Sequence, residues 1–157
     1  MKALVAYYSF SGTTEKAAKE LSKFLESKGH SATVEKIIPR KGYSKLGAYI
    51  LGGYQAIFKK KPRINAMKNK PAEFDLLAVL SPTWGSTCAP PVYSFVSALQ
   101  PARKGQKAMA INTCGGTPGN VTKTVSQVLE GKGFKILAAF SIKEVGGLNE
   151  RLANIQL

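Results

Sequence analysis

The sequence has few of the residues on which metal sites and covalent catalysts depend. It contains two cysteines, Cys88 and Cys114, and one histidine, His30, among 157 residues. Two cysteines cannot form a disulfide framework, and neither has neighbours at metal-ligand spacing. A single histidine essentially excludes a zinc site and a Ser-His-Asp triad. These shortages indicate a reduced, cytoplasmic protein, and we expect no metal.

Long apolar runs are also missing. No stretch approaches the roughly 20 residues that span a bilayer. The first lysine is followed only by the apolar residues 3–6, which are too few for the core of a signal peptide. With 44% hydrophobic and 20% charged residues, the composition is that of a globular chain. The length predicts a single domain that spans residues 1–157.

Acidic residues are scarce as well. Nine Asp and Glu residues stand against 23 Lys and Arg, which gives a net charge of +14. Ten of the basic residues and none of the acidic ones lie between Lys36 and Lys70, which leaves 13 basic and nine acidic residues elsewhere. Such a local excess suggests nucleic acid, an anionic membrane or an acidic partner. Because no recognised nucleic-acid motif is present, we expect no nucleic acid.

Short apolar runs alternate with amphipathic segments along the chain. We expect strands at residues 3–8, 31–38, 76–80, 107–111 and 134–140. We expect helices at residues 17–25, 90–99 and 121–129, and a short final helix that carries Leu148, Leu152 and Ile155. This alternation predicts an α/β fold, in which a parallel sheet has helices on both faces and right-handed crossovers.

The stretch from Pro39 to Pro71 interrupts this regular pattern. It has an apolar stripe at helical spacing, flanked by basic residues: Leu46, Tyr49, Ile50, Gly53, Tyr54, Ile57 and Phe58. One interpretation is the crossover helix between the second and third strands, followed by a basic loop. The other is a docking helix, within residues 44–63, for a partner or a membrane surface, since aromatic and basic residues meet there.

Three polar loops follow the first, third and fourth strands, at residues 9–14, 81–90 and 112–120. In an open α/β sheet these loops meet at one edge, where ligands bind. The first loop places four hydroxyl side chains and a glycine ahead of a helix: Ser9, Ser11, Gly12, Thr13 and Thr14. A helix amino terminus offers free N–H groups and a favourable dipole, so this loop suits a phosphate. It has neither a Walker A motif nor the glycine pattern of dinucleotide-binding folds.

The first loop resembles the flavodoxin phosphate loop, in which Ser/Thr-x-Ser/Thr-Gly-x-Thr holds the phosphate of FMN. The second loop is similar to a flavodoxin loop in which Pro-Thr precedes an aromatic residue, here Trp84. The third is similar to the loop that covers the other side of the flavin. The resemblance extends from Met1 to about Phe140. It implies a three-layer flavodoxin-like fold with a five-stranded parallel sheet in the order 2-1-3-4-5 and helices on both faces.

The resemblance implies FMN as the cofactor and assigns a role to each loop. Trp84 would stack on or beside the flavin ring, Cys114 would be a small neighbour of the ring, and Cys88 would pack at a helix start. No side chain stands out as a catalytic acid or base. The implied cofactor-binding residues are Ser9, Phe10, Ser11, Gly12, Thr13, Thr14, Pro82, Thr83, Trp84, Gly85, Ser86, Asn112, Thr113, Cys114, Gly115 and Gly116.

Three features depart from flavodoxins that carry electrons, which are typically acidic. The charge here is basic, and the connection from the second strand to the third is long and basic. The tail after the last strand is short, which would leave part of a sheet face bare and favour a homodimer. The three loops contain no Asp or Glu, so we expect reduced flavin to be less destabilised and its midpoint potential to be higher.

The function that these observations favour is an FMN-binding electron-transfer protein. The alternative is an NAD(P)H-dependent FMN or quinone reductase, in which Lys59–Lys61 and Arg63 would attract the NADPH phosphate. A third alternative is a flavin-free binding module. The expected partner is an acidic redox protein or NAD(P)H, and residues 44–63 are the candidate contact with a membrane surface.

Overall fold

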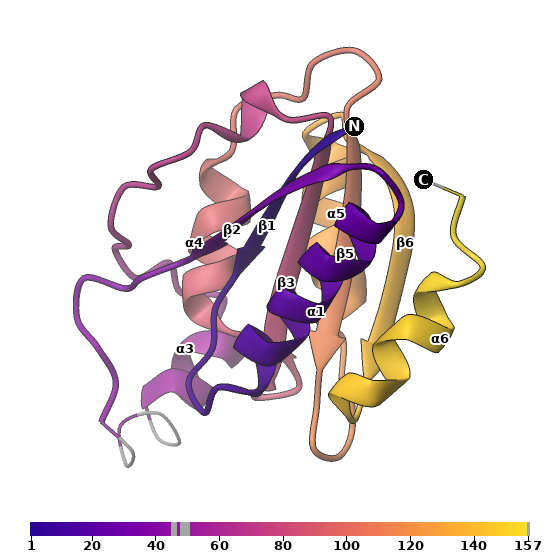
Figure 1. Ribbon diagram of the computed structural model, residues 1–157. Coiled ribbons are helices and arrows are strands. Elements are labelled where there is room, and N and C mark those ends of the chain that lie inside the picture. Colours follow the sequence, from indigo (N-terminus) through magenta and orange to yellow (C-terminus); the bar gives the residue numbers. More distant parts are fainter. Residues whose placement is uncertain (45–46, 48–50, 157) are drawn as a thin grey trace.

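The protein is described by a computed structural model that covers residues 1–44, 47 and 51–156. Its centre is a parallel sheet in the order β2-β1-β3-β5-β6 (Figure 1). These strands are β1 (Lys2–Tyr7), β2 (Ser31–Lys36), β3 (Leu76–Trp84), β5 (Lys107–Thr113) and β6 (Lys135–Ile142). The order confirms the predicted 2-1-3-4-5 arrangement. The sequence did not predict β4 (Thr87–Cys88), which pairs antiparallel with the end of β3.

Helices cover both faces of the sheet (Figure 1). On one face lie α4 (Pro90–Ala98) and α5 (Val121–Gly131), and on the other lie α1 (Thr13–Ser27) and the short α6 (Leu148–Leu152). Side chains of β1 alternate between these two cores, as a strand buried on both faces requires. Two 3-10 turns lie at Pro71–Glu73 and Val145–Gly147.

The segment between β2 and β3 contains a helix, as the crossover-helix interpretation expects, but its described apolar side chains do not face the sheet. Its described helix is α3 (Gly53–Ile57), only five residues long. The apolar stripe points outward: Tyr54, Ile57 and Phe58 are 51%, 62% and 60% exposed. The residues packed closest to the neighbouring segments, Gly52 and Ala56, are small. Three members of the stripe, Leu46, Tyr49 and Ile50, lie outside the described residues.

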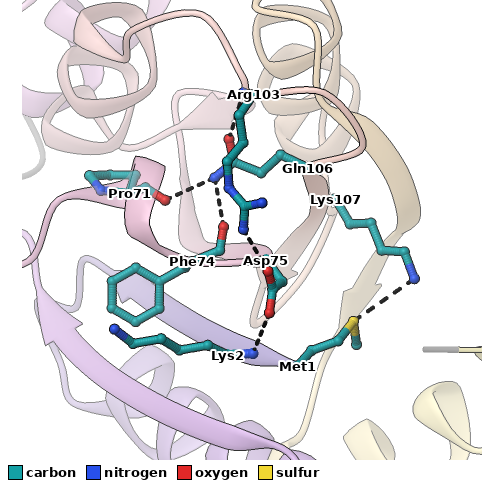
Figure 2. Close-up of polar contacts among 8 residues, drawn as sticks. All are labelled: Met1, Lys2, Pro71, Phe74, Asp75, Arg103, Gln106 and Lys107. Carbon is teal, nitrogen blue, oxygen red and sulfur yellow. Dashed lines mark hydrogen bonds and ion pairs between the residues drawn. The ribbon is translucent and has the colours of Figure 1, made fainter.

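The amino-terminal edge of the sheet is closed by a polar network (Figure 2). The Asp75 carboxylate accepts the backbone N–H of Lys2 at 2.8 Å and a guanidinium hydrogen bond from Arg103. The side-chain amide of Gln106 donates to the carbonyls of Pro71 and Phe74. These bonds join the starts of β1, β3 and β5, and the Lys2 bond and the Arg103 guanidinium lower the pKa of Asp75.

Within the part of the chain that the structure describes, no helix combines the length and apolar character needed to cross a bilayer. The same residues contain no cluster of three or more His, Cys, Asp or Glu side chains suited to a metal ion.

Candidate functional site

A cavity of about 640 Å³ opens at the carboxyl-terminal edge of the sheet, within the range of small-molecule pockets. Twelve of the sixteen residues predicted to bind a cofactor line it: Phe10, Ser11, Thr13, Thr14, Pro82, Thr83, Trp84, Gly85, Thr113, Cys114, Gly115 and Gly116. The other four predicted residues, Ser9, Gly12, Ser86 and Asn112, are not among its lining residues. Three further lining residues were not predicted: Gly53, Thr117 and Lys143.

The first loop presents the amino terminus of α1 to this cavity. Gly12 precedes the helix with a φ of 96°, and no side chain caps the first turn. The Ser9 hydroxyl accepts the backbone N–H of Gly12 at 3.0 Å, so it shapes the loop from within. The hydroxyls of Ser11 and Thr13 lie 3.4 Å apart at the surface. The first-turn N–H groups and these two hydroxyls are thus directed to a site that suits an anion.

A buried hydrogen bond joins the first loop to the third. The hydroxyls of Thr14 and Thr113 are 2.7 Å apart, and these residues are 2% and 4% exposed. Because the two threonines are 99 positions apart in the chain, the bond forms only when β1 and β5 flank β3 in the folded sheet. It fixes the helix amino terminus relative to the glycine-rich loop.

The second loop is more ordered than the sequence predicts. Residues 81–84 continue β3, and a two-residue turn at Gly85 and Ser86 leads back into β4. Both turn residues have positive φ, at 51° and 63°, as a type I′ hairpin requires. The Ser86 carbonyl accepts the backbone N–H of Asn120 at 2.7 Å. Ser86 therefore supports the third loop instead of lining the cavity.

Trp84, the chain's only tryptophan, is held edge-on in an aromatic cluster. Its ring centroid lies 5.6 Å from that of Tyr8, 5.9 Å from Phe10 and 5.1 Å from Tyr43. The segment before α3 also packs against it, since a Cβ on Gly52 would lie 2.3 Å from the indole. Trp84 is half-buried and lines the cavity, so its ring is positioned before any ligand arrives.

The two tyrosines of this cluster are polar groups in an apolar setting. Burial, followed by the neighbouring Tyr43, raises the pKa of Tyr8 to about 12. Burial also raises the pKa of Tyr43, whose hydroxyl donates to the Gln55 side chain at 2.7 Å. Both phenols therefore stay neutral at physiological pH. Sequence reasoning missed them because only the fold brings them to Trp84.

The side chain of Asn112 holds the ends of three strands together behind the cavity lining. It is fully buried, and its amide donates to the Pro118 carbonyl at 3.0 Å and to the Ser141 hydroxyl at 3.2 Å. Its side-chain oxygen accepts the Thr83 hydroxyl at 3.1 Å. Asn112 thus connects the ends of β3, β5 and β6, and its side chain is occupied by protein partners.

The third loop gives the cavity a thin wall. Gly115 and Gly116 line it, and a Cβ on either would meet nothing within 4 Å. Cys114 is buried beside them, with its sulfur 3.7 Å from the Ile142 carbonyl. The other cysteine, Cys88, is buried just before α4, and burial raises the pKa of its thiol to about 11. Cys88 therefore packs at a helix start, as the sequence predicted.

Lys143 supplies charge that the sequence reasoning missed. It follows β6 and is the one charged side chain among the described residues that line the cavity. The rule that located the other loops, that ligands bind beyond the carboxyl ends of parallel strands, applies equally to the last strand and would have found it. Because the described lining carries no carboxylate, the local field favours negative charge in the cavity.

The fold and cavity define an open α/β protein with a cavity where the strand order reverses, between β1 and β3, which is the usual place for a ligand in such folds. No protein-family model matches the sequence, and no curated protein is similar enough to match it. Solved structures do resemble it over nearly its whole length. A flavoprotein in complex with FMN from Lactobacillus acidophilus is 18% identical with a TM-score of 0.71, covering 96% of this chain and 97% of that one.

Two flavodoxins also resemble this chain in fold over nearly its whole length. A mutant flavodoxin from Pseudomonas aeruginosa is 18% identical with a TM-score of 0.62, and the match covers 98% of this chain and 95% of that one. A flavodoxin from the domain Archaea is 19% identical with a TM-score of 0.60, and the match covers 96% of this chain and 90% of that one. The chain therefore has the flavodoxin-like fold, as the sequence resemblance implied.

Proposed function

We propose that this protein binds FMN in the cavity and serves as an electron-transfer protein. The observation that carries the proposal is the amino terminus of α1, which no side chain caps and which opens between Ser11 and Thr13. These groups would hold the phosphate through hydroxyl and backbone N–H donors, without a basic side chain. The solved flavoprotein complex with FMN, on the same fold, supports the assignment.

The remaining walls fit the flat ring of a flavin. Gly115 and Gly116 leave open space along one side, where backbone can lie against a planar ligand. Trp84 also lines the cavity, and its aromatic neighbours already fix its ring. Aromatic contacts of this kind contribute about 0.5–1.5 kcal/mol beyond their buried area. Backbone groups of Thr83 and Gly85 would meet the polar edge of the ring.

When bound, FMN supplies one- and two-electron chemistry, and the protein supplies binding and electrostatic tuning. The described lining residues include no carboxylate and no histidine, which favours a carrier over an acid-base catalyst. Lys143 would stabilise the negative charge that reduction adds to the site. We therefore expect a higher midpoint potential than in acidic flavodoxins, and a lower one in Lys143→Gln. A very low second potential in spectroelectrochemical titration would contradict this.

The assignment is tested by comparing FMN with riboflavin, which lacks the phosphate. Because Trp84 is the only tryptophan, its fluorescence reports binding of either ligand. FMN should bind more tightly than riboflavin, and Ser11→Ala with Thr13→Ala should weaken FMN binding about tenfold or more per hydroxyl while leaving riboflavin unchanged. Ser27→Ala is the matched control, since this hydroxyl lies at the other end of α1 and bonds to the Phe24 carbonyl.

Two results would count against this function. Equal affinity for FMN and riboflavin would show that the protein does not bind the phosphate. Absence of flavin absorbance, both after purification and after FMN titration, would favour a flavin-free module. Stopped-flow mixing with NADPH separates carrier from reductase. Rapid bleaching of the flavin would favour the NAD(P)H-dependent reductase, whereas a carrier should bleach only with a redox partner protein.

A further inference from the structure

An apolar and basic surface lies beside the cavity and is not used in holding FMN. We name it the α3 patch. Its apolar members are 51–62% exposed: Leu51, Tyr54, Ile57 and Phe58. Its basic members follow directly along the chain: Lys59, Lys60, Lys61 and Arg63. Large apolar side chains exposed together are unusual on a monomer and mark interaction sites.

The patch is held in place from its inner side. Gly52 lies against the indole of Trp84, and the Gly53 carbonyl lies against the turn at Gly85. Ala56 is buried, and Gln55 accepts the Tyr43 hydroxyl at 2.7 Å. With this side packed on the cavity rim, the opposite side must face outward. In Figure 1, α3 lies at the same lower edge of the molecule as the carboxyl ends of the strands.

The end of α3 places a lysine where glycine is favoured. Lys59 has a φ of 50°, and its N–H donates to the Ala56 carbonyl at 3.1 Å. The Lys60 N–H reaches back to the Gln55 carbonyl at 2.8 Å, which completes a Schellman motif. Glycine would adopt this backbone without strain. Lys59 therefore occupies a backbone conformation that is strained for a residue with a side chain.

The charge of this region favours a lipid surface over a protein partner. Residues 36–70 contain ten basic residues and no acidic one, and eight of the ten are lysine. Protein interfaces are enriched in arginine and depleted in lysine. Anionic lipid attracts both residues equally, through charge alone. Exposed aromatic and aliphatic side chains beside such charge are typical of segments that lie in the membrane interface.

We propose that the α3 patch docks the protein on an anionic membrane surface. Ile57 and Phe58 enter the headgroup region, while Lys59, Lys60 and Lys61 contact lipid phosphates. Because Gly53 belongs both to α3 and to the cavity lining, docking brings the cavity rim to the membrane. The docking needs no flavin, so it stands or falls separately from the proposed function.

The test is co-sedimentation with vesicles of phosphatidylcholine mixed with phosphatidylglycerol, with pure phosphatidylcholine as the comparison. The protein should bind only the anionic vesicles and dissociate as salt is added. Replacing Lys59, Lys60 and Lys61 by Gln should weaken binding about 100-fold, since each basic residue contributes about fivefold. Ile57→Ser with Phe58→Ser should weaken it about tenfold or more.

The matched control replaces three exposed lysines elsewhere, Lys28, Lys104 and Lys135, by Gln, which gives the same net charge and should leave binding nearly unchanged. Equal loss in the two triple variants would overturn the proposal in favour of general charge attraction. Absence of binding to anionic vesicles would overturn it outright. If the α3 variants instead dissociated a dimer in sedimentation velocity, the patch would be an interface between copies of this chain. Each measurement is made with and without FMN.

Discussion

Gly119 provides a direct test of how the loops around the cavity are packed. It has a φ of 61°, and a Cβ added to it would lie 2.3 Å from the Ser86 carbonyl oxygen. That contact is to backbone, so the hairpin turn would have to move. The turn is held there by the hydrogen bond of 2.7 Å from the Asn120 N–H to the same oxygen. Gly119→Ala should therefore separate the second loop from the third.

The expected loss has two parts. Placing alanine in the left-handed region costs about 1–2 kcal/mol. Breaking the bond between Asn120 and Ser86 removes about 1 kcal/mol more. The free energy of unfolding should fall by about 2–3 kcal/mol in all. Urea denaturation followed by the fluorescence of Trp84 measures it, since the indole sits next to the displaced turn.

Gly105→Ala is the matched control for this substitution. Gly105 also has positive φ, at 79°, but a Cβ there would meet nothing within 4 Å. It should show the conformational cost alone, and the entropic effect of alanine on the unfolded chain cancels between the two variants. If Gly119→Ala were no more destabilising than Gly105→Ala, the close approach of Gly119 to the Ser86 carbonyl would not hold the two loops together.

Thr14→Val should cost about 1–3 kcal/mol because it leaves the buried Thr113 hydroxyl unpaired, and adding Thr113→Val should cost less than a second equal step in the same urea titration. Folding lowers the pKa of Asp75 from 3.8, so this carboxylate stabilises the protein above pH 3.8 and the stabilisation is lost as the pH falls further. The melting temperature of Asp75→Asn should therefore not show this part of the acid dependence. Burial raises the pKa of Cys88 from 9.0 to about 11, so its thiol should resist alkylation at pH 8 until the protein unfolds, and its contribution to stability should fall as the pH rises through that range. Lys59→Gly should raise the free energy of unfolding by up to about 1 kcal/mol while weakening vesicle binding, a combination that a purely structural lysine would not produce.

The sequence predicted the fold well because its strands are buried on both faces. Runs such as Leu76–Leu80 are continuously apolar, a pattern that few other structures produce. The end of the same strand was missed, since Pro82 and Thr83 have the composition of a loop. Only pairing with β4 and β5 shows that they extend the sheet.

The sequence predicted which loops form the candidate site, but not what each side chain does there. The sequence assigned the same role to the hydroxyls of Ser9 and Ser11. The Ser9 hydroxyl bonds to the loop's own backbone, whereas Ser11 lines the cavity. The apolar stripe at Tyr54 and Phe58 suggested a buried helix face. It is exposed because the glycine beside Trp84 allows close packing on the opposite side, a relation that spans residues distant in the sequence.

The hydrogen bonds of Asn112 also determine when the cavity can exist. They join Asn112 to Thr83, 29 positions earlier in the chain, and to Ser141, 29 positions later. These segments meet only after β3, β5 and β6 have assembled, so no partly folded chain presents a complete pocket. Opening of the second or the third loop would break bonds that hold the pocket together, so an opened loop would not retain a ligand. Hydrogen exchange at the Asn120 amide should then slow on ligand addition in proportion to ligand concentration, as linkage to the folded state requires.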